Sequence, residues 1–359
     1  MAERLKDMFF TQDSVNKFSD MIKQHYPAFG KPQFLRLMFD ESFQAKELLG
    51  KMKHTTKCLH NTLPESYKEA LDILKKAAPH VKGFEAMALP DYVATYGMHD
   101  WDLSLPALGF FTKYYSSELA IRPFLAKDPE KGMAYMSAWA ADKDPKVRRL
   151  ASEGCRPRLP WAMALPKFKK DPSPIFPILE KLKNDPSEDV RRSVANNLND
   201  ISKDNPELVL EICKKWHGES EKTDKIVKHA CRSLLKAGNE RALGIFGYSE
   251  PSLIDVKNLK LDKKALNIGN FLTFSFDIVV TKKSRVRLEY AVYYVKAKGQ
   301  ISKKVFKITE NDYAAGTYSI TRKQSFQEQT TRKHYPGIHR ISIIVNGKEK
   351  AKASFELNE

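Results

Sequence analysis

Residues 144–151 read DPKVRRLA, and a second copy of the same phrase, DPSEDVRRSVA, occupies residues 185–195. Counted from Val147 to Val190, the two copies lie 43 residues apart. This distance falls within the period of solenoid repeats that are built from two helices. A weaker third copy, DKIVKHA, follows at residues 224–230. The spacing predicts a stack of HEAT-like helical repeats, in which each repeat packs against the next.

The order of residues within the phrase explains how it folds. Asp followed by Pro favours the start of a helix, because the carboxylate accepts backbone N–H groups and proline presets the backbone. The Val, Leu or Val, and Ala positions form an apolar stripe that is buried against neighbouring helices. The adjacent arginines are therefore expected to project from the stack as a basic row that suits a polyanion. The members of this row are Arg148, Arg149, Arg191 and Arg192.

The alternative for this row is that its arginines are ordinary solvated helix charges. The distribution of charge along the chain favours a polyanion. Residues 255–359 contain 21 Lys and Arg against 10 Asp and Glu, a net of +11 out of the formal +17 of all 359 residues. Nucleic acid is therefore the first partner to consider, although a basic surface can also serve solubility alone.

Other classes of protein are disfavoured by what the sequence lacks. It has no run of 18 apolar residues, and its first residues lead into an amphipathic helix rather than a signal peptide, so we expect a cytoplasmic protein without a membrane partner. The four cysteines have no short paired spacing, and the nine histidines form no metal motif. We expect no metal, no cofactor and a monomer.

The chain divides into two domains with different hydrophobic periods. Residues 1–248 have the periodicity of helices, and residues 246–256 read as a linker. Residues 256–359 alternate with period two, most clearly at 271–280, 285–295, 340–345 and 351–357. Asn346-Gly347 joins the last two segments and is a strong hairpin signal. About seven strands in this length predict an immunoglobulin-like β-sandwich.

Two turns of this predicted sandwich are basic. One runs from residue 281 to 285 and the other from 330 to 335. Basic side chains on such turns are candidate phosphate contacts. The candidates are Lys282, Lys283, Arg332 and Lys333.

An aromatic stretch at residues 110–124, FFTKYYSSELAIRPF, contains a carboxylate of interest. Glu118 follows the aromatics at steps of three and four residues, which indicates a position on a helix or at its end. A carboxylate against apolar side chains is either paired with an arginine or held for chemistry. Arg122 lies four residues further on, and from the residues alone a structural Glu118–Arg122 pair is the favoured interpretation.

Two further segments carry polar or aromatic groups that a nucleic acid could meet. Residues 152–161, SEGCRPRLPW, contain helix breakers, so Arg156, Arg158 and Trp161 are expected on a loop between helices. Such a loop can clamp phosphates and stack on a base or sugar, or Trp161 can instead plug the space between repeats. Residues 196–200, NNLND, predict either the end of a helix or a polar groove lining.

Taken together, these motifs resemble the AlkC branch of the AlkC/AlkD alkylpurine DNA glycosylases. The resemblance rests on SSELAIRPF at 116–124, the two Val-Arg-Arg helices, RPRLPW at 156–161, NLND at 197–200 and the immunoglobulin-like tail. It implies a C-shaped stack of HEAT-like repeats that grips duplex DNA, with the tail completing the grip. It also implies removal of cationic methylated bases such as 3-methyladenine and, in AlkC relatives, 3-methylcytosine.

The resemblance also implies roles for particular residues. The catalytic glutamate of the family matches Glu118, its active-site tryptophan matches Trp161, and an acidic neighbour matches Asp200. Arg149 and Arg156 match arginines that hold the DNA backbone nearby. The implied chemistry suits these groups, because a methylated base is already cationic and leaves without a general acid. A carboxylate and an indole face can then stabilise the oxocarbenium-like sugar.

Two rival hypotheses come from other classes of protein. One is a non-catalytic HEAT-repeat scaffold that binds nucleic acid or an acidic protein partner. It accounts for the repeats and the charge but gives no reason for Glu118 and Asp200 beside a basic face. The other is an extracellular carbohydrate-binding protein, which the absence of a signal peptide disfavours.

Overall fold

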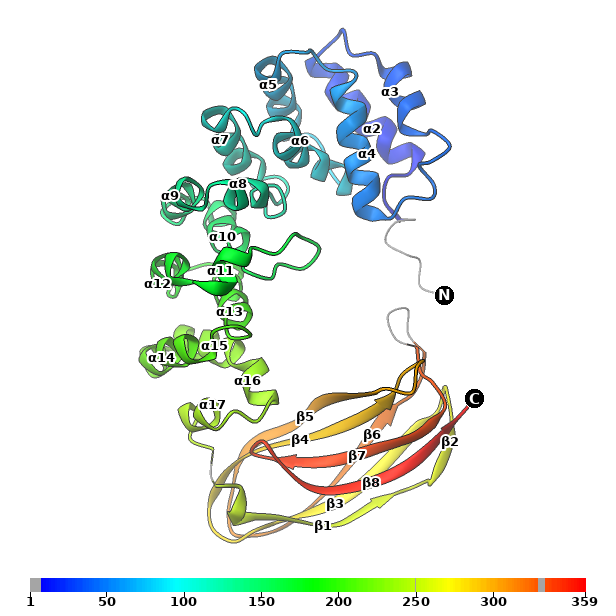
Figure 1. Cartoon of the computed structure of the whole chain (residues 1–359), viewed down its shortest axis with the longest axis vertical. Helices are drawn as coiled ribbons and strands as arrows, with labels where there is room; N and C mark the ends of the chain where they lie inside the picture. Colours follow the sequence, from blue (N-terminus) through cyan, green and yellow to red (C-terminus); the bar gives the residue numbers. More distant parts are fainter. Residues whose placement is uncertain (1–7, 249, 329–332) are drawn as a thin grey trace. The chain divides into compact units, whose positions relative to one another are not determined.

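The computed structural model describes residues 8–248, 250–328 and 333–359, and it divides into two compact units that meet between Ala230 and Cys231. The first unit is all-helical, and the second contains two short helices followed by a β-sandwich (Figure 1). The helices of the first unit are α2 (Gln12–His25), α3 (Lys31–Met38), α4 (Leu48–His60), α5 (Tyr67–Ala77), η1 (Phe84–Met87), α6 (Ala88–Tyr96), α7 (Trp101–Phe111), α8 (Arg122–Lys127), α9 (Pro129–Trp139), α10 (Pro145–Gly154), α11 (Pro166–Lys170), η2 (Ser173–Ile175), α12 (Phe176–Leu182), α13 (Glu188–Ile201), α14 (Pro206–Trp216) and α15 (Glu221–Ala230).

The repeated phrases form successive helices of a stack, as their spacing predicts. Helix α10 packs against α13, and α13 packs against α15. Figure 1 shows these three helices in one column, with α9, α12 and α14 in a second column beside it. Val147 and Leu150 of α10 and Val190 and Val194 of α13 are all buried. The predicted apolar stripe is therefore confirmed, and it aligns equivalent positions of consecutive repeats.

The two Asp-Pro pairs do not start their helices in the same way. In the first copy Asp144 is the N-cap of α10, and its carboxylate accepts a hydrogen bond of 2.8 Å from the backbone N–H of Lys146. In the second copy Ser187 takes the N-cap position of α13. Asp185 lies two residues earlier, where its carboxylate accepts from the backbone N–H of Ser187 at 2.8 Å and also binds an arginine of the preceding repeat. The prediction of equivalent caps is wrong for this copy.

The second unit begins with α16 (Arg232–Lys236) and α17 (Glu240–Ile245), which belong to the same compact unit as the strands. Gly238, between these helices, lies against Gly347 of a β-hairpin. A Cβ atom on Gly238 would meet the carbonyl oxygen of Gly347 at 2.7 Å. Glycine at both positions therefore permits the close approach of the helical segment to the hairpin.

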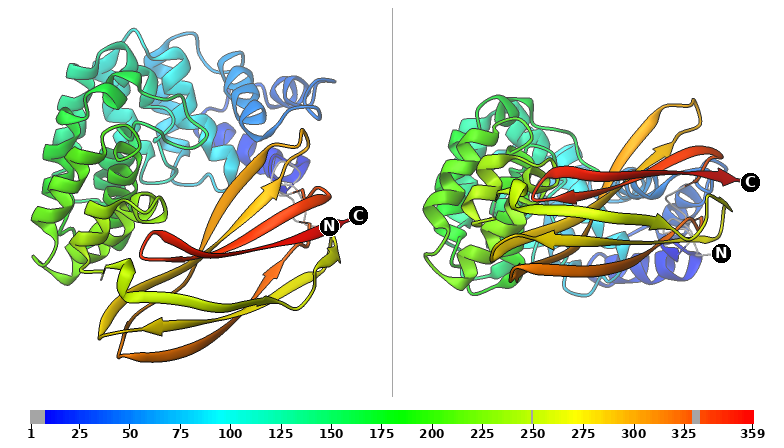
Figure 2. Two further views of the ribbon diagram at one scale, coloured as in Figure 1. Left: turned by 60° about the horizontal axis from the view of Figure 1, so that its bottom comes forward. Right: turned by 90° about the horizontal axis from the view of Figure 1, so that it is seen from below.

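Eight strands form the sandwich within the described residues, in place of the seven or so that the sequence indicates. They follow η3 (Pro251–Leu253) and are β1 (Ile254–Leu261), β2 (Ala265–Asn267), β3 (Phe271–Val280), β4 (Ser284–Val295), β5 (Ile301–Tyr313), β6 (Gly316–Ser325), β7 (Gly337–Val345) and β8 (Lys348–Asn358). One sheet has the order β1-β3-β6 and the other β2-β8-β7-β4-β5. Their inner faces supply a shared core that includes Phe274, Val292 and Ile343. Figure 2 shows the strands of the two sheets from two further directions. The predicted fold class, a helical repeat stack followed by a β-sandwich, is confirmed.

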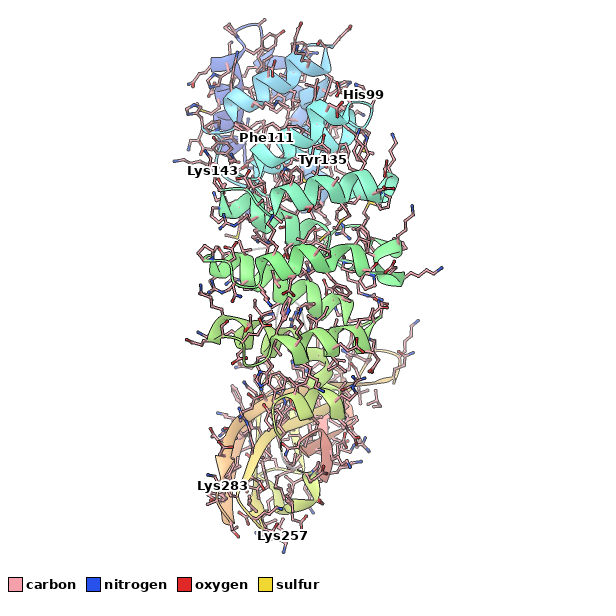
Figure 3. All side chains as sticks on the ribbon, turned by 90° about the vertical axis from the view of Figure 1, so that its left-hand side faces the viewer. His99, Phe111, Tyr135, Lys143, Lys257 and Lys283 are labelled. Carbon is pink, nitrogen blue, oxygen red and sulfur yellow. The ribbon has the colours of Figure 1, made fainter. Side chains whose placement is uncertain are left out.

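The predicted hairpin and the predicted basic turns lie at the ends of these strands. Asn346 and Gly347, with φ of 45° and 81°, form the β7–β8 turn. Lys282 and Lys283 are exposed at the β3–β4 turn, and Figure 3 shows Lys283 on the outside of the sandwich. In the second basic turn Lys333 Nζ lies 5.9 Å from the ring centroid of Tyr335, whereas Arg332 falls outside the described residues.

Across the described ranges, every helix is too short or too polar to cross a lipid bilayer.

Candidate active site

Glu118 lies in the turn that connects α7 to α8. Its carboxylate oxygen Oε2 accepts hydrogen bonds from Ser116 Oγ at 2.9 Å and from Arg149 Nη1 at 2.8 Å. The Glu118 side chain is 23 % exposed, so one side of the carboxylate reaches solvent. Within the described part of the chain, Oε1 receives no hydrogen bond. The local geometry therefore fixes the carboxylate through one oxygen and leaves the other oxygen available.

The favoured interpretation of a Glu118–Arg122 pair is wrong. Residues 112–121 are not helical, so side chains four residues apart do not share a helix face there. Arg122 is instead fully buried, and its guanidinium donates to backbone carbonyls of a distant loop. The partner of Glu118 is Arg149 on α10, which belongs to the first Val-Arg-Arg phrase.

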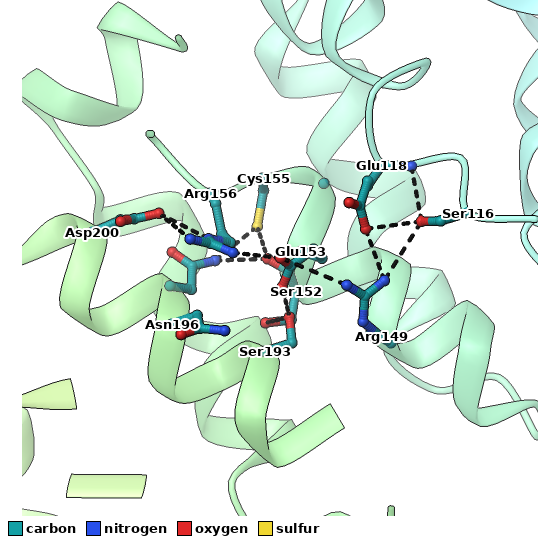
Figure 4. Close-up of polar contacts among 12 residues, drawn as sticks. Ser116, Glu118, Arg149, Ser152, Glu153, Cys155, Arg156, Ser193, Asn196 and Asp200 are labelled. Carbon is teal, nitrogen blue, oxygen red and sulfur yellow. Dashed lines mark hydrogen bonds and ion pairs between the residues drawn. The ribbon is translucent and has the colours of Figure 1, made fainter. Parts of the chain in front are cut away.

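The Glu118–Arg149 pair is the first link in a chain of alternating charges (Figure 4). Arg149 Nη2 lies 3.6 Å from Glu153 Oε1, and the same oxygen accepts from Arg156 Nη1. Arg156 Nε and Nη2 each lie 2.8 Å from Asp200 Oδ2. The last contact, between Asp200 Oδ1 and Lys203 Nζ, is 2.9 Å. The full chain, which we call the ion-pair chain, consists of Glu118, Arg149, Glu153, Arg156, Asp200 and Lys203.

Opposite charges dominate the electrostatics of the arginines in this chain. Burial alone would lower the pKa of Arg149, but Glu118 and Glu153 outweigh it and raise that pKa. Burial likewise opposes the charge on Arg156, yet Glu153 and Asp200 raise its pKa. Both guanidinium groups therefore stay cationic.

The phenol of Tyr115 lies close enough to Glu118 for the carboxylate to affect its pKa. Burial and the nearby charges of Glu118 and Glu85 raise the pKa of Tyr115 to about 12. Tyr115 packs edge-on against Phe84, with ring centroids 5.8 Å apart. The approach to Glu118 is thus bordered by aromatic surface, and the phenol keeps its proton at neutral pH.

Polar residues of α13 support the middle of the ion-pair chain. Ser193 Oγ donates to Glu153 Oε2 at 2.6 Å, and Asn197 Nδ2 donates to the Ser152 carbonyl at 2.8 Å. Helix α13 continues to Ile201, so the polar run at 196–200 does not end it. Asn197 and Asp200 are buried and contact α10 and the segment just after it rather than lining an open groove.

Trp161 projects from the segment between α10 and α11, and its side chain is 62 % exposed. The alternative of a plug between repeats is therefore wrong. Its backbone has φ of +65°, a left-handed conformation that is uncommon for a large side chain. In the same segment the side chain of Leu159 is buried, whereas that of Met163 is exposed to solvent. The structure thus presents the indole to solvent on a constrained backbone.

The other arginines that the sequence singles out differ in accessibility. Arg148 is 14 % exposed and makes two hydrogen bonds to the Asp185 carboxylate, of 2.6 and 3.0 Å. Arg148 thus links two repeats. The prediction that it projects from the stack as part of the basic row is wrong. Arg158 is paired with Asp204 through two hydrogen bonds.

The second pair of adjacent arginines lies nearer to solvent. Arg191 donates to the carbonyls of Asp185 and Pro186, at 2.5 and 2.9 Å. Arg192 is 55 % exposed and pairs with Asp189 of its own helix. A hollow of about 240 Å³ lies between α13 and α15, and basic side chains predominate in its lining. The hollow is lined by Glu188, Arg191, Arg192, Ala195, Lys222, Lys225, Ile226 and His229.

Sequence reasoning missed Glu153, which joins the two halves of the ion-pair chain. Its position contains a signal, because it lies four residues after Arg149 and three before Arg156. The four-residue spacing places Arg149 and Glu153 on one side of α10, whereas Arg156 lies two residues beyond the end of that helix. Reading the phrase beyond Ala151 would have suggested this link.

The donor set of the site favours acid, base and electrostatic chemistry rather than metal binding. Each carboxylate of the ion-pair chain is bound to an arginine or lysine, which competes with a cation for the same oxygens. In the part of the chain that the structure describes, no group of three His, Cys, Asp or Glu residues gathers with the geometry of a metal site.

Comparisons with known proteins agree with this arrangement. A family model described as "DNA alkylation repair enzyme" matches residues 115–234, which include Glu118 and Asp200. A second model, "Uncharacterised protein YhaZ, C-terminal Ig-like domain", matches residues 255–359. The "Uncharacterized protein YhaZ" of Bacillus subtilis (strain 168) is 46 % identical over 354 residues, which cover 98 % of this chain and 99 % of that protein.

A solved structure gives the most informative similarity. It is described as "Pseudomonas fluorescens alkylpurine DNA glycosylase AlkC bound to DNA containing an abasic site analog". The match has a TM-score of 0.95 and 38 % sequence identity, and it covers 99 % of this chain and 100 % of that chain. The similarity therefore extends through both units.

Arg148 is mostly buried and Arg192 is mostly exposed, so we expect substitution of Arg148 to destabilise the protein more than substitution of Arg192. Arg148→Met leaves the largely buried Asp185 carboxylate without its partner and should lower the free energy of unfolding by about 3 kcal/mol. Arg192→Met breaks only an exposed pair and should change that free energy by less than about 1 kcal/mol. Thermal or urea unfolding of both variants measures the difference, and equal stability would contradict the linking role of Arg148.

Proposed function

Since the chain belongs to the AlkC family of alkylpurine DNA glycosylases, which are DNA alkylation repair enzymes, we propose that it hydrolyses the N-glycosidic bond of cationic alkylated bases in duplex DNA. The proposed substrates are 3-methyladenine and 3-methylcytosine. The observation that carries the proposal is the Glu118 carboxylate, which is fixed through Oε2 by Arg149 and Ser116 while its other side reaches solvent. A fixed anion of this kind is suited to meet a cation that develops during reaction.

The proposed reaction begins with departure of the base. The bond between C1′ and the base nitrogen breaks, and its electron pair neutralises the positive charge that methylation placed on the base. The sugar becomes oxocarbenium-like, and Glu118 stabilises it electrostatically from one side. Water then adds to C1′ and gives its proton to the carboxylate or to solvent. No acid is needed for the leaving base, because its charge makes it a good leaving group.

Trp161 is proposed to act as the aromatic partner in this site. An exposed indole can stack on nucleic acid and attract a cationic base or sugar through its ring face. Arg149 is the more exposed of the two arginines at the centre of the ion-pair chain, so it is the better candidate for a nearby phosphate. Arg156 and Asp200 are buried in the described conformation, and we propose that they hold the site's geometry.

The partner of this enzyme is proposed to be alkylated double-stranded DNA, bound by a monomer in the bacterial cytoplasm. The Pseudomonas relative was solved with DNA that contains an abasic-site analog, which supports DNA as the partner. The basic hollow between α13 and α15 and the exposed lysines of the β3–β4 turn are the proposed phosphate contacts. Domain boundaries at residues 1–248 and 256–359 are proposed as the functional division.

The non-catalytic scaffold is the rival that an experiment must separate. A scaffold uses Glu118 only as a partner of Arg149, whereas an enzyme uses the same carboxylate against the substrate. Substitution of Glu118 therefore affects stability in the first case and turnover in the second.

Glu118→Gln should lower single-turnover release of 3-methyladenine by about 100-fold or more, because the amide cannot oppose a developing cation with a full charge. The amide oxygen can still accept from Arg149, so the melting temperature and DNA affinity should change little. Glu130→Gln, at an exposed position of α9, serves as the matched control and should retain full activity. A Glu118→Gln enzyme that melts earlier yet excises normally per folded molecule would show that Glu118 is only a partner of Arg149, whereas a folded wild-type protein that releases no base would favour the scaffold.

The substrate range should follow the charge of the leaving base. Matched duplexes with 3-methyladenine or 3-methylcytosine should lose the base, whereas duplexes with hypoxanthine or uracil should stay intact, since the site offers no recognised acid to protonate a neutral base. Single-turnover excision from the four duplexes measures this selectivity. Efficient release of uracil or hypoxanthine would require a leaving-group acid and would rule out the proposed mechanism.

The β3–β4 turn should contribute to DNA affinity through phosphates. Changing Lys282 and Lys283 together to Gln should reduce the slope of log affinity against log salt by about 0.9 for each phosphate that a lysine no longer neutralises. Lys257 and Lys260 on β1 are also exposed, so changing them to Gln removes the same charge from another part of the sandwich. A reduction of equal size in both double variants would indicate general attraction rather than phosphate binding at the turn.

A further inference from the structure

Arg122 is a buried arginine whose described contacts are all backbone carbonyls. Its Nε donates to the Met163 carbonyl at 2.6 Å, and its Nη1 donates to the carbonyls of Gly154 and Arg156 at 3.0 and 2.8 Å. All three acceptors belong to residues 154–163, the segment that carries Trp161. We call this segment the Trp161 loop. One guanidinium therefore bonds the loop near its start and again just after the tryptophan.

Burial of a charged guanidinium costs free energy, which indicates that Arg122 does more than fill space in the core. Burial lowers the pKa of Arg122 to about 10, because the charged form is removed from water. An apolar side chain would avoid that cost. What an apolar side chain cannot supply is a planar fork of donors for carbonyls that point in different directions.

The surroundings of Arg122 hold the fork in place. Gly154 is the last residue of α10, and its carbonyl lies at the negative end of that helix, where a cation is favourable. A Cβ atom on Gly154 would meet Ile121 Cγ2 at 2.7 Å and Met136 Cε at 2.9 Å, so helix α10 approaches the Ile121–Arg122 segment as closely as glycine allows. The guanidinium is thus brought directly to the start of the Trp161 loop.

The loop needs an external constraint of this kind. Trp161 has φ of +65° and most of its ring is in solvent, so packing of its own side chain does not hold that backbone. Two backbone hydrogen bonds close parts of the loop. Ala162 N–H donates to Leu159 O at 3.3 Å, and Leu165 N–H, just after the loop, donates to Pro157 O at 3.1 Å. Arg122 supplies three more from outside.

We propose that Arg122 is a positioning residue for base excision, which fixes the Trp161 loop and thereby presents the indole at the site before DNA arrives. The part of this inference that concerns excision rests on the proposed function. The Arg156 side chain is itself held by Glu153 and Asp200, so the part of the loop that depends on Arg122 is the part that carries Trp161. Arg122 follows the Glu118 turn directly and begins α8, so it connects the carboxylate and tryptophan sides of the site.

The structural arm of the test measures hydrogen exchange in the free protein. Arg122→Met keeps much of the side-chain length but removes every donor, so peptides from residues 156–165 should exchange faster while peptides from α9 and α12 keep their protection. Arg122→Lys retains the charge and should restore part of the protection. This variant also keeps the test valid if Arg122→Met does not fold.

The functional arm measures single-turnover release of 3-methyladenine at saturating enzyme. Arg122→Met should lower the rate by about tenfold to hundredfold, as expected when a catalytic group loses its position, with a smaller loss for Arg122→Lys. DNA affinity should change less than the rate. In a Trp161→Ala background the same Arg122 substitutions should lower the rate by less than about threefold, because the group that they position is already absent.

Arg287→Lys is the matched control, since Arg287 is a buried arginine of the sandwich that pairs with Glu289 and Glu310. It should leave both the excision rate and the exchange of residues 156–165 unchanged. The inference is overturned if Arg122→Met excises at the wild-type rate per folded molecule, or if its loss of rate is just as large without Trp161. If the wild-type protein releases no methylated base, the proposed function fails, whereas the exchange arm still decides whether Arg122 holds the loop.

Discussion

The hydrogen-bonded ion pair between Glu118 and Arg149 is the interaction on which the rest of the site depends. Glu118 lies in an irregular turn, and without Arg149 and Ser116 its side chain would be free to rotate. A carboxylate that must oppose a short-lived cation is effective only if it is already charged and oriented. Arg149 supplies the orientation, and Glu153, Arg156 and Asp200 hold Arg149 in turn through alternating charges.

The repeat architecture explains how these charges meet. Helices α10 and α13 are equivalent elements of adjacent repeats, and their buried Val and Leu positions align them side by side. Glu153 on α10 therefore lies beside Ser193 on α13, and Arg156, just after α10, lies beside Asp200 on α13. Partly buried charges are tolerated here because each has an opposite partner, whereas removal of a single member would leave its neighbour unpaired. The apolar stripes thus set the geometry on which the polar site is built.

Much of the fold, and part of the candidate site, could be predicted from the sequence, for physical reasons that differ between the two. The repeats and the sandwich follow from hydrophobic period, and the Asn346-Gly347 turn follows from its backbone requirement. Glu118 is singled out by a motif and its aromatic context, and its catalytic role stays a prediction. The partner of Glu118 was mistaken, because pairing by four-residue spacing assumes a helix, and residues 112–121 are a turn. The link between Arg148 and Asp185 was missed because it joins two repeats and depends on tertiary packing.

In the proposed mechanism the enzyme stabilises a sugar cation instead of assisting the leaving base. The most direct measurement is the secondary kinetic isotope effect at C1′ during single-turnover release of 3-methyladenine from duplex DNA labelled with tritium at that carbon. We expect the unlabelled sugar to react clearly faster, because C1′ becomes planar as the oxocarbenium character develops. Equal rates for the labelled and unlabelled sugars, with normal base release, would contradict it.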